Sequence, residues 1–326
     1  MNKKLAIVIP AFKSDYFEFT LESLSNQTCK EFKLYIGDDS SPEDLKNIVD
    51  KFRSKLDIHY VRFDDNLGGT DLVEQWNRCV NLTKNEEWIW LFSDDDVLDP
   101  KCVESFFVYI NNNIDVELVH FNVKVIDNLG VERLDHLAAR FPKILSSKIF
   151  YEKKIKGELL SFAIEYVFKR NVYKNEAGFK NFDLAWCADD ATWIKFAMKK
   201  GIHTIEEPFV YWRYSGINIS SLTNNLSILK RKLNSKSDYF IWIKSFFIKN
   251  KIQSDINHFV LIRWLLIEIN ANRQLLLTNR ILIAFTYTYK LLGILGGLIS
   301  FFYVIYFELK KALGRIVNIK FFKKMM

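Results

Sequence analysis

Short apolar runs alternate with helix-like stretches through the first third of the chain. The run from Leu5 to Ile9 is uninterrupted and ends at Pro10, which is typical of a strand buried on both faces of a parallel sheet. Similar runs follow at about residues 32–37, 58–63 and 88–92. Strands that alternate with helices predict an α/β fold with a mostly parallel, doubly wound central sheet flanked by helices, and such sheets bind ligands beyond the carboxyl ends of their strands.

The chain is longer than one such domain requires. Its 326 residues are 49% hydrophobic and 26% charged, as in a folded globular protein. The alternation becomes less regular after about residue 115, and beyond about residue 220 the apolar residues suggest helices. We therefore expect an α/β domain over residues 1–221, with halves that divide at about residue 115, followed by a helical extension over residues 222–326.

The extension contains an apolar segment at about residues 281–307, interrupted by Lys290. Its uncharged part, Leu291 to Phe307, has 17 residues, the lower limit for crossing a bilayer. A tail with six basic and no acidic residues follows and carries most of the formal net charge of +7. This combination predicts contact with an anionic membrane surface and no binding of nucleic acid. An in-plane or re-entrant helix, a membrane span, a soluble helix packed on the core and a solvated tail are the alternatives.

The N-terminus and the cysteines predict a cytoplasmic location. The apolar run before Pro10 has five residues, too few for a signal peptide, and the four cysteines show no paired C-x-x-C spacing. With the apolar extension, we expect a protein at the cytoplasmic face of the inner or plasma membrane, attached peripherally, monotopically or by a single pass. The sequence contains neither a P-loop motif nor a G-x-G-x-x-G after its first strand, which counts against enzymes built on those motifs.

Three consecutive acids, Asp94, Asp95 and Asp96, follow the last of the four apolar runs. Adjacent carboxylates repel one another, so a folded protein tolerates them best where a cation compensates their charge. Mg²⁺ or Mn²⁺, held by one or two carboxylates and by substrate phosphates, fits such a run. A solvated acidic turn that caps the helix after Pro100 is the alternative.

An aromatic ring and a carboxylate lie at the ends of the first two strands. Phe12 follows Pro10 and Ala11, and Asp39 follows the second strand. Together they can stack on a nucleotide base and accept its imino hydrogen. An Asx turn also explains the sequence around Asp39.

A glycine-containing turn from Asn66 through Gly68 to Thr70 opens a helix. Glycines at a helix start let backbone amides approach a ligand, and the helix dipole there favours negative charge. An ordinary glycine turn is the alternative.

A second acidic pair, Asp189 and Asp190, stands among apolar and aromatic residues. Burial and mutual repulsion raise the pKa of one member of such a pair, which prepares a general base. A capped helix over residues 191–199 is the alternative. Further on, Arg213 lies among aromatic residues and can hold a diphosphate, although a surface cation–π pair is also compatible with this pattern.

The order of these motifs resembles the family 2 glycosyltransferases, which are inverting enzymes of the GT-A fold. The resemblance covers roughly residues 5–221 and rests on six pieces of sequence: IVIPAF, GDDSSPED, NLGGTDLVEQWN, WIWLFSDDDVLDP, GFKNFDLAWCADD and YWRYSGINISS. It implies a GT-A, Rossmann-like catalytic domain with a nucleotide-binding half and an acceptor-binding half. It also implies a metal-dependent hexosyl- or N-acetylhexosaminyltransferase that uses a nucleotide sugar, with a UDP-sugar as the expected donor, and a glycan or lipid-linked acceptor in surface polysaccharide synthesis.

The resemblance assigns roles to the site residues. Pro10, Ala11 and Phe12 line the base pocket, and Asp39 pairs with the base. Asp94 and Asp96 are the ends of a D-x-D motif, with Asp96 as the direct metal ligand. Beside these, the motifs described above add Asn66, Gly68, Asp95 and Arg213 to the expected nucleotide-sugar site. Asp190 is the base that deprotonates the acceptor hydroxyl.

Three positions depart from the family pattern. Ser93 stands where the acidic stretch often begins, so the register of the metal ligands can shift by one residue. Asp189 replaces the usual glutamate, and Tyr214 with Ser215 fills the place of a histidine that many members carry. A nucleotidyltransferase of related fold, a glycoside hydrolase and a non-enzymatic membrane-associated protein are the competing interpretations.

Overall fold

The structure is a computed structural model that describes residues 4–134, 139–216, 219–222, 224–272 and 274–325. The chain divides into two compact units, Met1–Ile219 and Ser220–Met326. This division lies two residues from the boundary at 221 that the sequence suggests. The functional division of the first unit into two halves stays a prediction.

The strands of the first unit begin with the apolar runs seen in the sequence. In chain order, the strands are β1 (Leu5–Ala11), β2 (Phe32–Asp38), β3 (Ile58–Arg62), β4 (Trp88–Leu91), β5 (Val97–Leu98), β6 (Leu118–Ile126), β7 (Ile144–Leu145), β8 (Tyr166–Lys169) and β9 (Ile202–Arg213). Residues 5–9 of β1 are completely buried, as expected for a central strand with both faces covered.

Helices connect these strands. They are α1 (Phe17–Ser25), α2 (Leu45–Asp50), α3 (Leu72–Val80), α4 (Cys102–Asn112), α5 (Ser147–Lys156), α6 (Arg170–Asn175) and α7 (Ala188–Phe196), with short 3₁₀ turns η1 (Asp183–Ala185) and η2 (Ile219–Ser221). Local sequence sets several boundaries: the Asp71 carboxylate accepts a hydrogen bond from the Glu74 amide at the start of α3, and Gly157 ends α5 in the left-handed conformation.

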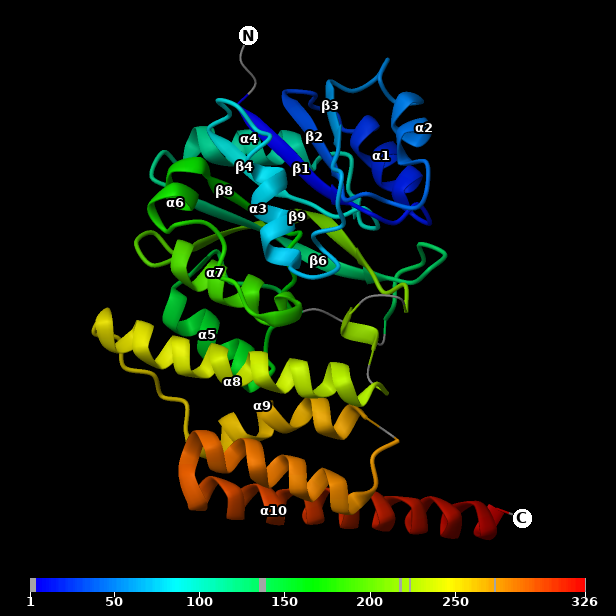
Figure 1. Ribbon diagram of the computed structural model, residues 1–326, viewed down its shortest axis with the longest axis vertical. Coiled ribbons are helices and arrows are strands. Elements are labelled where there is room, and N and C mark those ends of the chain that lie inside the picture. The colour runs from blue at the N-terminus through cyan, green and yellow to red at the C-terminus, as the bar shows by residue number, and fades with distance from the viewer. Residues whose placement is uncertain (1–3, 135–138, 217–218, 223, 273, 326) are drawn as a thin grey trace. The chain divides into compact units, whose positions relative to one another are not determined.

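The strands form one sheet in the order β3-β2-β1-β4-β8-β6-β9-β5, and β7 pairs with β9. Figure 1 shows this sheet with helices packed around it. β3, β2, β1 and β4 are parallel, which confirms the α/β fold expected from the alternation. β8 is antiparallel to both β4 and β6, so the sheet is mixed beyond β4. The irregular sequence after residue 115 gave no sign of this reversal, because strand direction depends on the path of the connecting chain.

The parallel register places the carboxyl ends of β1, β2 and β4 side by side. Ala11 pairs with Asp38, and Val8 pairs with Leu91. The chain therefore leaves these three strands at one edge of the sheet, with Phe12, Asp39 and the acidic run close by. The core beneath this edge contains the side chains of β1, β2 and β4 together with α1 and α4.

The second unit consists of α8 (Leu226–Lys249), α9 (His258–Ala271) and α10 (Leu277–Met325). The helical extension expected over residues 222–326 is therefore confirmed in its secondary structure. An apolar cluster joins all three, with Leu233 from α8, Ile262 and Leu266 from α9, and Ala284 and Val304 from α10. Lys236 is buried in this bundle and pairs with Glu268 at 2.9 Å.

α10 reverses direction at Gly293, whose φ of 69° and ψ of −165° are not helical. Arg280 pairs with Glu308 at 2.5 Å, and the Thr288 hydroxyl donates to the Ser300 hydroxyl at 2.8 Å. Residues 28 positions apart would lie roughly 40 Å apart along one straight helix. The two parts of α10 therefore form an antiparallel hairpin, visible in Figure 1 as the orange and red limbs. The apolar segment at 281–307 is thus not one continuous helix.

By length and composition, Leu277–Lys311 is sufficiently long and apolar to cross a membrane, and 22% of its most apolar window is buried within the protein. The turn at Gly293 divides this stretch into two limbs. A single pass by one straight helix over these residues is therefore not the conformation observed.

Candidate active site

The acidic run lies against the end of β1. One oxygen of Asp94, Oδ2, accepts hydrogen bonds from the backbone amides of Phe12 at 2.8 Å and Lys13 at 2.7 Å. The Lys13 ammonium pairs with Asp95 at 3.0 Å. The segment that the sequence assigned to a base pocket is thus joined directly to the predicted D-x-D motif.

Asp96 is held from the opposite side by the end of β9. Its Oδ1 accepts a hydrogen bond from the Arg213 backbone amide at 2.6 Å, and its Oδ2 accepts one from the Ser93 hydroxyl. The Arg213 guanidinium is buried and donates to the carbonyls of Asp95 and Asp127, at 2.8 and 3.0 Å. Arg213 therefore stabilises the acidic run through hydrogen bonds to Asp95 and Asp96. A contact between its guanidinium and a diphosphate stays a prediction.

The acidic run is buried and carries excess negative charge. All three aspartates are at most 6% exposed. Burial, followed by repulsion from Asp95, raises the pKa of Asp94 to about 6 and raises that of Asp96 well above its usual range. Oxygen donors with uncompensated charge are the chemistry that a hard divalent cation requires, so these residues fit Mg²⁺ or Mn²⁺.

The acidic run by itself provides too few protein ligands to enclose a metal ion. Among the residues that the structure describes, no three His, Cys, Asp or Glu side chains are grouped to hold a metal ion. A cation there would need ligands from a bound phosphate, which is how Mg²⁺ is usually held in phosphate-binding enzymes. The alternative that the run caps the next helix is wrong, because α4 begins at Cys102 and its N-cap, Lys101, makes no side-chain cap.

Asp39 connects the second strand to the glycine turn. Its Oδ2 accepts the Gly68 amide at 2.8 Å, and its Oδ1 accepts the Leu67 amide at 2.9 Å and the Arg78 guanidinium at 2.6 Å. Desolvation raises the Asp39 pKa despite these partners. A Cβ atom on Gly68 would lie 2.6 Å from Asp39 Oδ2, so this approach requires glycine. Base recognition by Asp39 stays a prediction.

The other predicted base-site residues lie around this connection. Phe12 is 36% exposed and its carbonyl accepts the Ser41 hydroxyl at 2.6 Å, while Ala11 is buried and its carbonyl accepts the Asp39 amide at 2.9 Å. Pro10 is partly buried within β1, and the exposed Asn66 accepts the Gly69 amide at 2.6 Å. Phe12 is thus the ring of this group that presents accessible surface.

Asp189 and Asp190 lie in the first turn of α7, next to Lys154, a largely but not fully buried lysine. The Lys154 ammonium, from α5, pairs with Asp190 Oδ1 at 3.1 Å, and both side chains are about one-sixth exposed. Burial, followed by repulsion from Asp190, raises the Asp189 pKa to about 7. The capping alternative is wrong, because the N-cap of α7 is Cys187 in a left-handed conformation without a side-chain cap.

A further acid completes the surroundings of Lys154. Glu165 is fully buried, its Oε1 accepts the Phe162 amide at 2.6 Å, and its pKa is raised well above the usual range, mainly by burial. Lys154 also donates to the Ser161 carbonyl at 3.2 Å. Burial lowers the pKa of Lys154, but the neighbouring aspartates more than reverse this effect, and its pKa is raised. The Lys154 ammonium therefore interacts with three acids, Asp189, Asp190 and Glu165.

Phe162 links the two acidic groups. Its ring stacks on Trp212 with centroids 4.1 Å apart, and Trp212 precedes the Arg213 that holds Asp96. Its carbonyl accepts the Trp193 indole N–H at 3.3 Å, and Trp193 shares α7 with Asp190. The acidic run and the acidic pair are thus connected through one aromatic side chain and its backbone.

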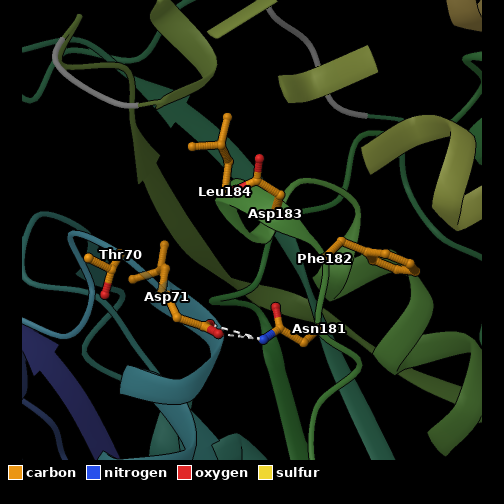
Figure 2. Close-up of a pocket in the computed structure, with 7 residues that line it drawn as sticks. Thr70, Asp71, Asn181, Phe182, Asp183 and Leu184 are labelled. Carbon is orange, nitrogen blue, oxygen red and sulfur yellow. Dashed lines mark hydrogen bonds between the residues drawn. The ribbon is translucent and has the colours of Figure 1, made fainter. Parts of the chain in front are cut away.

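The loop that precedes Asp189 and Asp190 has strained backbone conformations and lines a pocket. Leu184, Ala185 and Cys187 all have positive φ, between 53° and 68°, which is uncommon for residues other than glycine and is often found at functional sites. A pocket of about 370 Å³ lies between this loop and the start of α3. Figure 2 shows Asp71 and Asn181 joined across it by two hydrogen bonds, of 2.8 and 3.0 Å.

Sequence reasoning missed four residues of this site. Lys13 directly follows the piece IVIPAF, and Arg78 directly follows NLGGTDLVEQWN, so their positions next to these motifs were an available signal. Ser93 was noted as a departure and proves to bind Asp96. Lys154 gave no signal, because only the packing of α5 beside α7 brings it to Asp190.

Comparisons with known proteins agree with this geometry. The model of the family described as Glycosyl transferase family 2 matches residues 6–171, about half of the chain. An uncharacterized glycosyltransferase of Methanocaldococcus jannaschii is 30% identical over 135 residues, which are 40% of this chain and 45% of that protein. The GalNAc(5)-diNAcBac-PP-undecaprenol beta-1,3-glucosyltransferase of Campylobacter jejuni is 22% identical over 240 residues, 68% of this chain and 69% of that protein.

The fold has solved counterparts. The structure of Staphylococcus aureus TarS residues 1–349 in complex with UDP-GlcNAc superposes with a TM-score of 0.60 at 15% identity, over 88% of this chain and 81% of the other.

The two sequence relatives are matched only in part: the match spans less than half of the Methanocaldococcus protein and about two thirds of the Campylobacter protein. The matched region includes the acidic run, the glycine turn and Asp39. The chain therefore belongs to glycosyltransferase family 2.

Proposed function

We propose that the protein transfers a sugar from a nucleotide-sugar donor to a hydroxyl of a glycan or lipid-linked acceptor, with inversion at the anomeric carbon. The observation that carries the proposal is the joining of Phe12, Asp94 and Asp96 at one edge of the sheet by hydrogen bonds from β1 and β9. Pro10, Ala11, Phe12 and Asp39 are proposed to hold the base, and Asn66 and Gly68 to line the same site.

A UDP-sugar with a hexosyl or N-acetylhexosaminyl group is the proposed donor. TarS binds UDP-GlcNAc, and the Campylobacter relative is a glucosyltransferase that acts on an undecaprenol-linked glycan. These relatives support a role in surface polysaccharide synthesis. The pocket between Asp71 and Leu184 is lined by the hydroxyl of Thr70 and the carboxylate of Asp183, polar groups of a kind that can hydrogen-bond to sugar hydroxyls.

Asp94 and Asp96 are proposed to hold Mg²⁺ or Mn²⁺ together with the donor diphosphate. A bound divalent cation would offset the negative charge on the departing diphosphate. Lys13 already contributes a positive charge beside Asp95, and Arg213 fixes the backbone of the run. In this proposal the ligands are carboxylate oxygens just beyond the end of β4, held in place by backbone amides of Phe12, Lys13 and Arg213.

The proposed reaction is a single in-line displacement. The Asp190 carboxylate removes the proton from the acceptor hydroxyl while the acceptor oxygen bonds to the anomeric carbon. The bond from that carbon to the donor phosphate oxygen breaks, and its electron pair leaves with the nucleoside diphosphate. Lys154 keeps a positive charge beside Asp190, which favours the carboxylate form that can accept the proton.

The replacement Asp190→Asn tests the proposal with an assay that separates binding from transfer. We expect transfer from a UDP-sugar to fall by a factor of about 100 to 10,000, the usual contribution of a general base, while titration calorimetry finds UDP binding unchanged. Asp115→Asn is the matched control, because the Asp115 side chain is 83% exposed. Wild-type transfer rates in Asp190→Asn would refute the assigned base. Failure of the wild-type chain to bind any nucleotide sugar, with or without Mn²⁺, would refute the function.

A further inference from the structure

The second limb of α10 exposes a continuous apolar stripe. Six of its large apolar side chains are between 46% and 68% exposed: Ile294, Leu295, Leu298, Phe302, Tyr306 and Leu309. We call these six residues the outer stripe. At 100° per residue they fill an arc of roughly 120°, and no charged residue falls within it. Exposed apolar surface of this extent usually marks a binding surface.

The opposite side of the same limb is packed against protein. Val304 is 1% exposed and belongs to the apolar cluster with α8 and α9, and Ser300 is buried against Thr288 of the first limb. A Cβ atom on Gly297 would lie 2.7 Å from the Phe285 ring, so the two limbs approach closely there. A helix with one side in a folded bundle cannot be surrounded by lipid, and only its outer side is available to a partner.

Basic residues flank the outer stripe. Lys290 is exposed before its first residue, and Lys310 and Lys311 are exposed after its last. Glu308, the acidic residue of this limb, does not lie in the outer stripe, because its side chain pairs with Arg280 of the first limb. An apolar face bordered by lysines complements a bilayer surface with anionic headgroups, because the apolar side chains enter the acyl region while the ammonium groups stay among the phosphates.

We propose that the outer stripe attaches the second unit to an anionic membrane surface as a helix lying in the plane of one leaflet. The hairpin at Gly293 holds the limb against the bundle, so the stripe is presented without crossing the bilayer. This attachment is independent of the proposed reaction, since it needs neither donor nor acceptor.

Vesicle flotation of the full chain tests the attachment. We expect it to float with vesicles of phosphatidylglycerol and phosphatidylcholine and to bind vesicles of phosphatidylcholine alone more weakly. Phe302→Asp places a charge in the middle of the stripe and should reduce binding at least about tenfold. Ile114→Asp is the control, because Ile114 is an 87% exposed apolar residue of the first unit. Circular dichroism of both variants verifies that they fold.

The depth of the stripe distinguishes an in-plane helix from a span. Ile294, Phe302 and Leu309 are each replaced by cysteine and labelled with a fluorophore, and the unsubstituted protein is labelled in parallel as background. Lipid-borne quenchers should report one shallow depth for all three positions. Depths that differ by roughly 20 Å from end to end would overturn the in-plane arrangement. Wild-type vesicle binding by Phe302→Asp, or self-association in sedimentation that this change abolishes, would overturn the membrane as the partner.

Discussion

Lys154 shows how much one side chain can set the chemistry of a site. It is a largely buried cation that interacts with Asp189, Asp190 and Glu165, and its 3.1 Å pair with Asp190 links α5 to α7. A cation beside a carboxylate favours the ionised form, which a general base needs in order to accept a proton. Without Lys154, no cation would offset the effect of burial and mutual repulsion on the pKa values of these three acids. The proposed base would then keep its proton to a higher pH.

Lys154→Met is therefore expected to move the acidic limb of the pH profile of kcat/KM to higher pH and to lower transfer near neutral pH by about tenfold or more. Lys154→Arg should restore much of the profile because it keeps the charge. Lys153→Met is the control, since Lys153 pairs with the exposed Glu158 just beyond the end of α5. An unchanged pH profile in Lys154→Met, with a folded protein, would show that Lys154 has a structural role only.

At the scale of elements, the glycine turn before α3 binds directly to Asp39 at the end of β2, so two segments that the sequence predicted separately form one part of the site. Gly68 brings its amide to Asp39 at the end of β2, and Arg78 from α3 holds the same carboxylate. Asp71 then caps α3 and binds Asn181 of the loop before the acidic pair. Residues 66–71 thus contact both Asp39, the predicted base-binding residue, and the loop that lines the pocket.

Gly68→Ala should weaken UDP binding about tenfold or more and lower the free energy of unfolding by ~1–3 kcal/mol, the usual cost of overpacking. The added Cβ would meet Asp39 Oδ2 at 2.6 Å, and Asp39 is 4% exposed and held by Arg78. Gly69→Ala is the neighbouring control, because its Cβ would meet only the exposed Asn66 side chain, which can move. Calorimetry measures both quantities. Equal effects of the two changes would argue against a specific role of the Gly68–Asp39 contact.

At the scale of the whole molecule, the site is arranged for function at a cost in stability. The native pKa of Asp189 is about 7, above the value of ~4 of an unfolded aspartate. Between these values the folded chain binds more protons than the unfolded chain, so its free energy of unfolding falls as pH rises from about 4 to about 7. The first unit is therefore expected to unfold at a lower temperature at pH 8 than at pH 5.

Asp189→Asn removes this titration and should stabilise the first unit at pH 8 by on the order of 1–2 kcal/mol, with little effect at pH 4. Scanning calorimetry at several pH values measures the change and separates the two units if they unfold independently. Asp115→Asn, at an exposed carboxyl whose pKa is lowered by Lys200, should give no such gain at pH 8. A stability gain that is equal at all pH values would rule out the proposed origin in the Asp189 charge.

The local sequence determined the strands, the turn and the chemistry of the acids. A buried parallel strand needs an unbroken apolar run, which β1 and β4 have, and the residues after such runs meet at one edge of the sheet. That rule brought Phe12, Asp39 and Asp94 together without any knowledge of their contacts. The order of the motifs was sufficient for the family, since each matching piece keeps its place along the chain.

Only the tertiary structure decided which partners these residues have. Strand direction beyond β4, the pairing of Lys154 with Asp190, and the burial of Arg213 behind the acidic run all depend on contacts between distant segments, and no local pattern encodes them. The same holds for α10. Its composition permits a membrane span, but the reversal at Gly293 and the pairing of Arg280 with Glu308 fold it into a hairpin with one apolar side exposed. Composition sets how much apolar surface a helix has, and packing decides which side of it stays available.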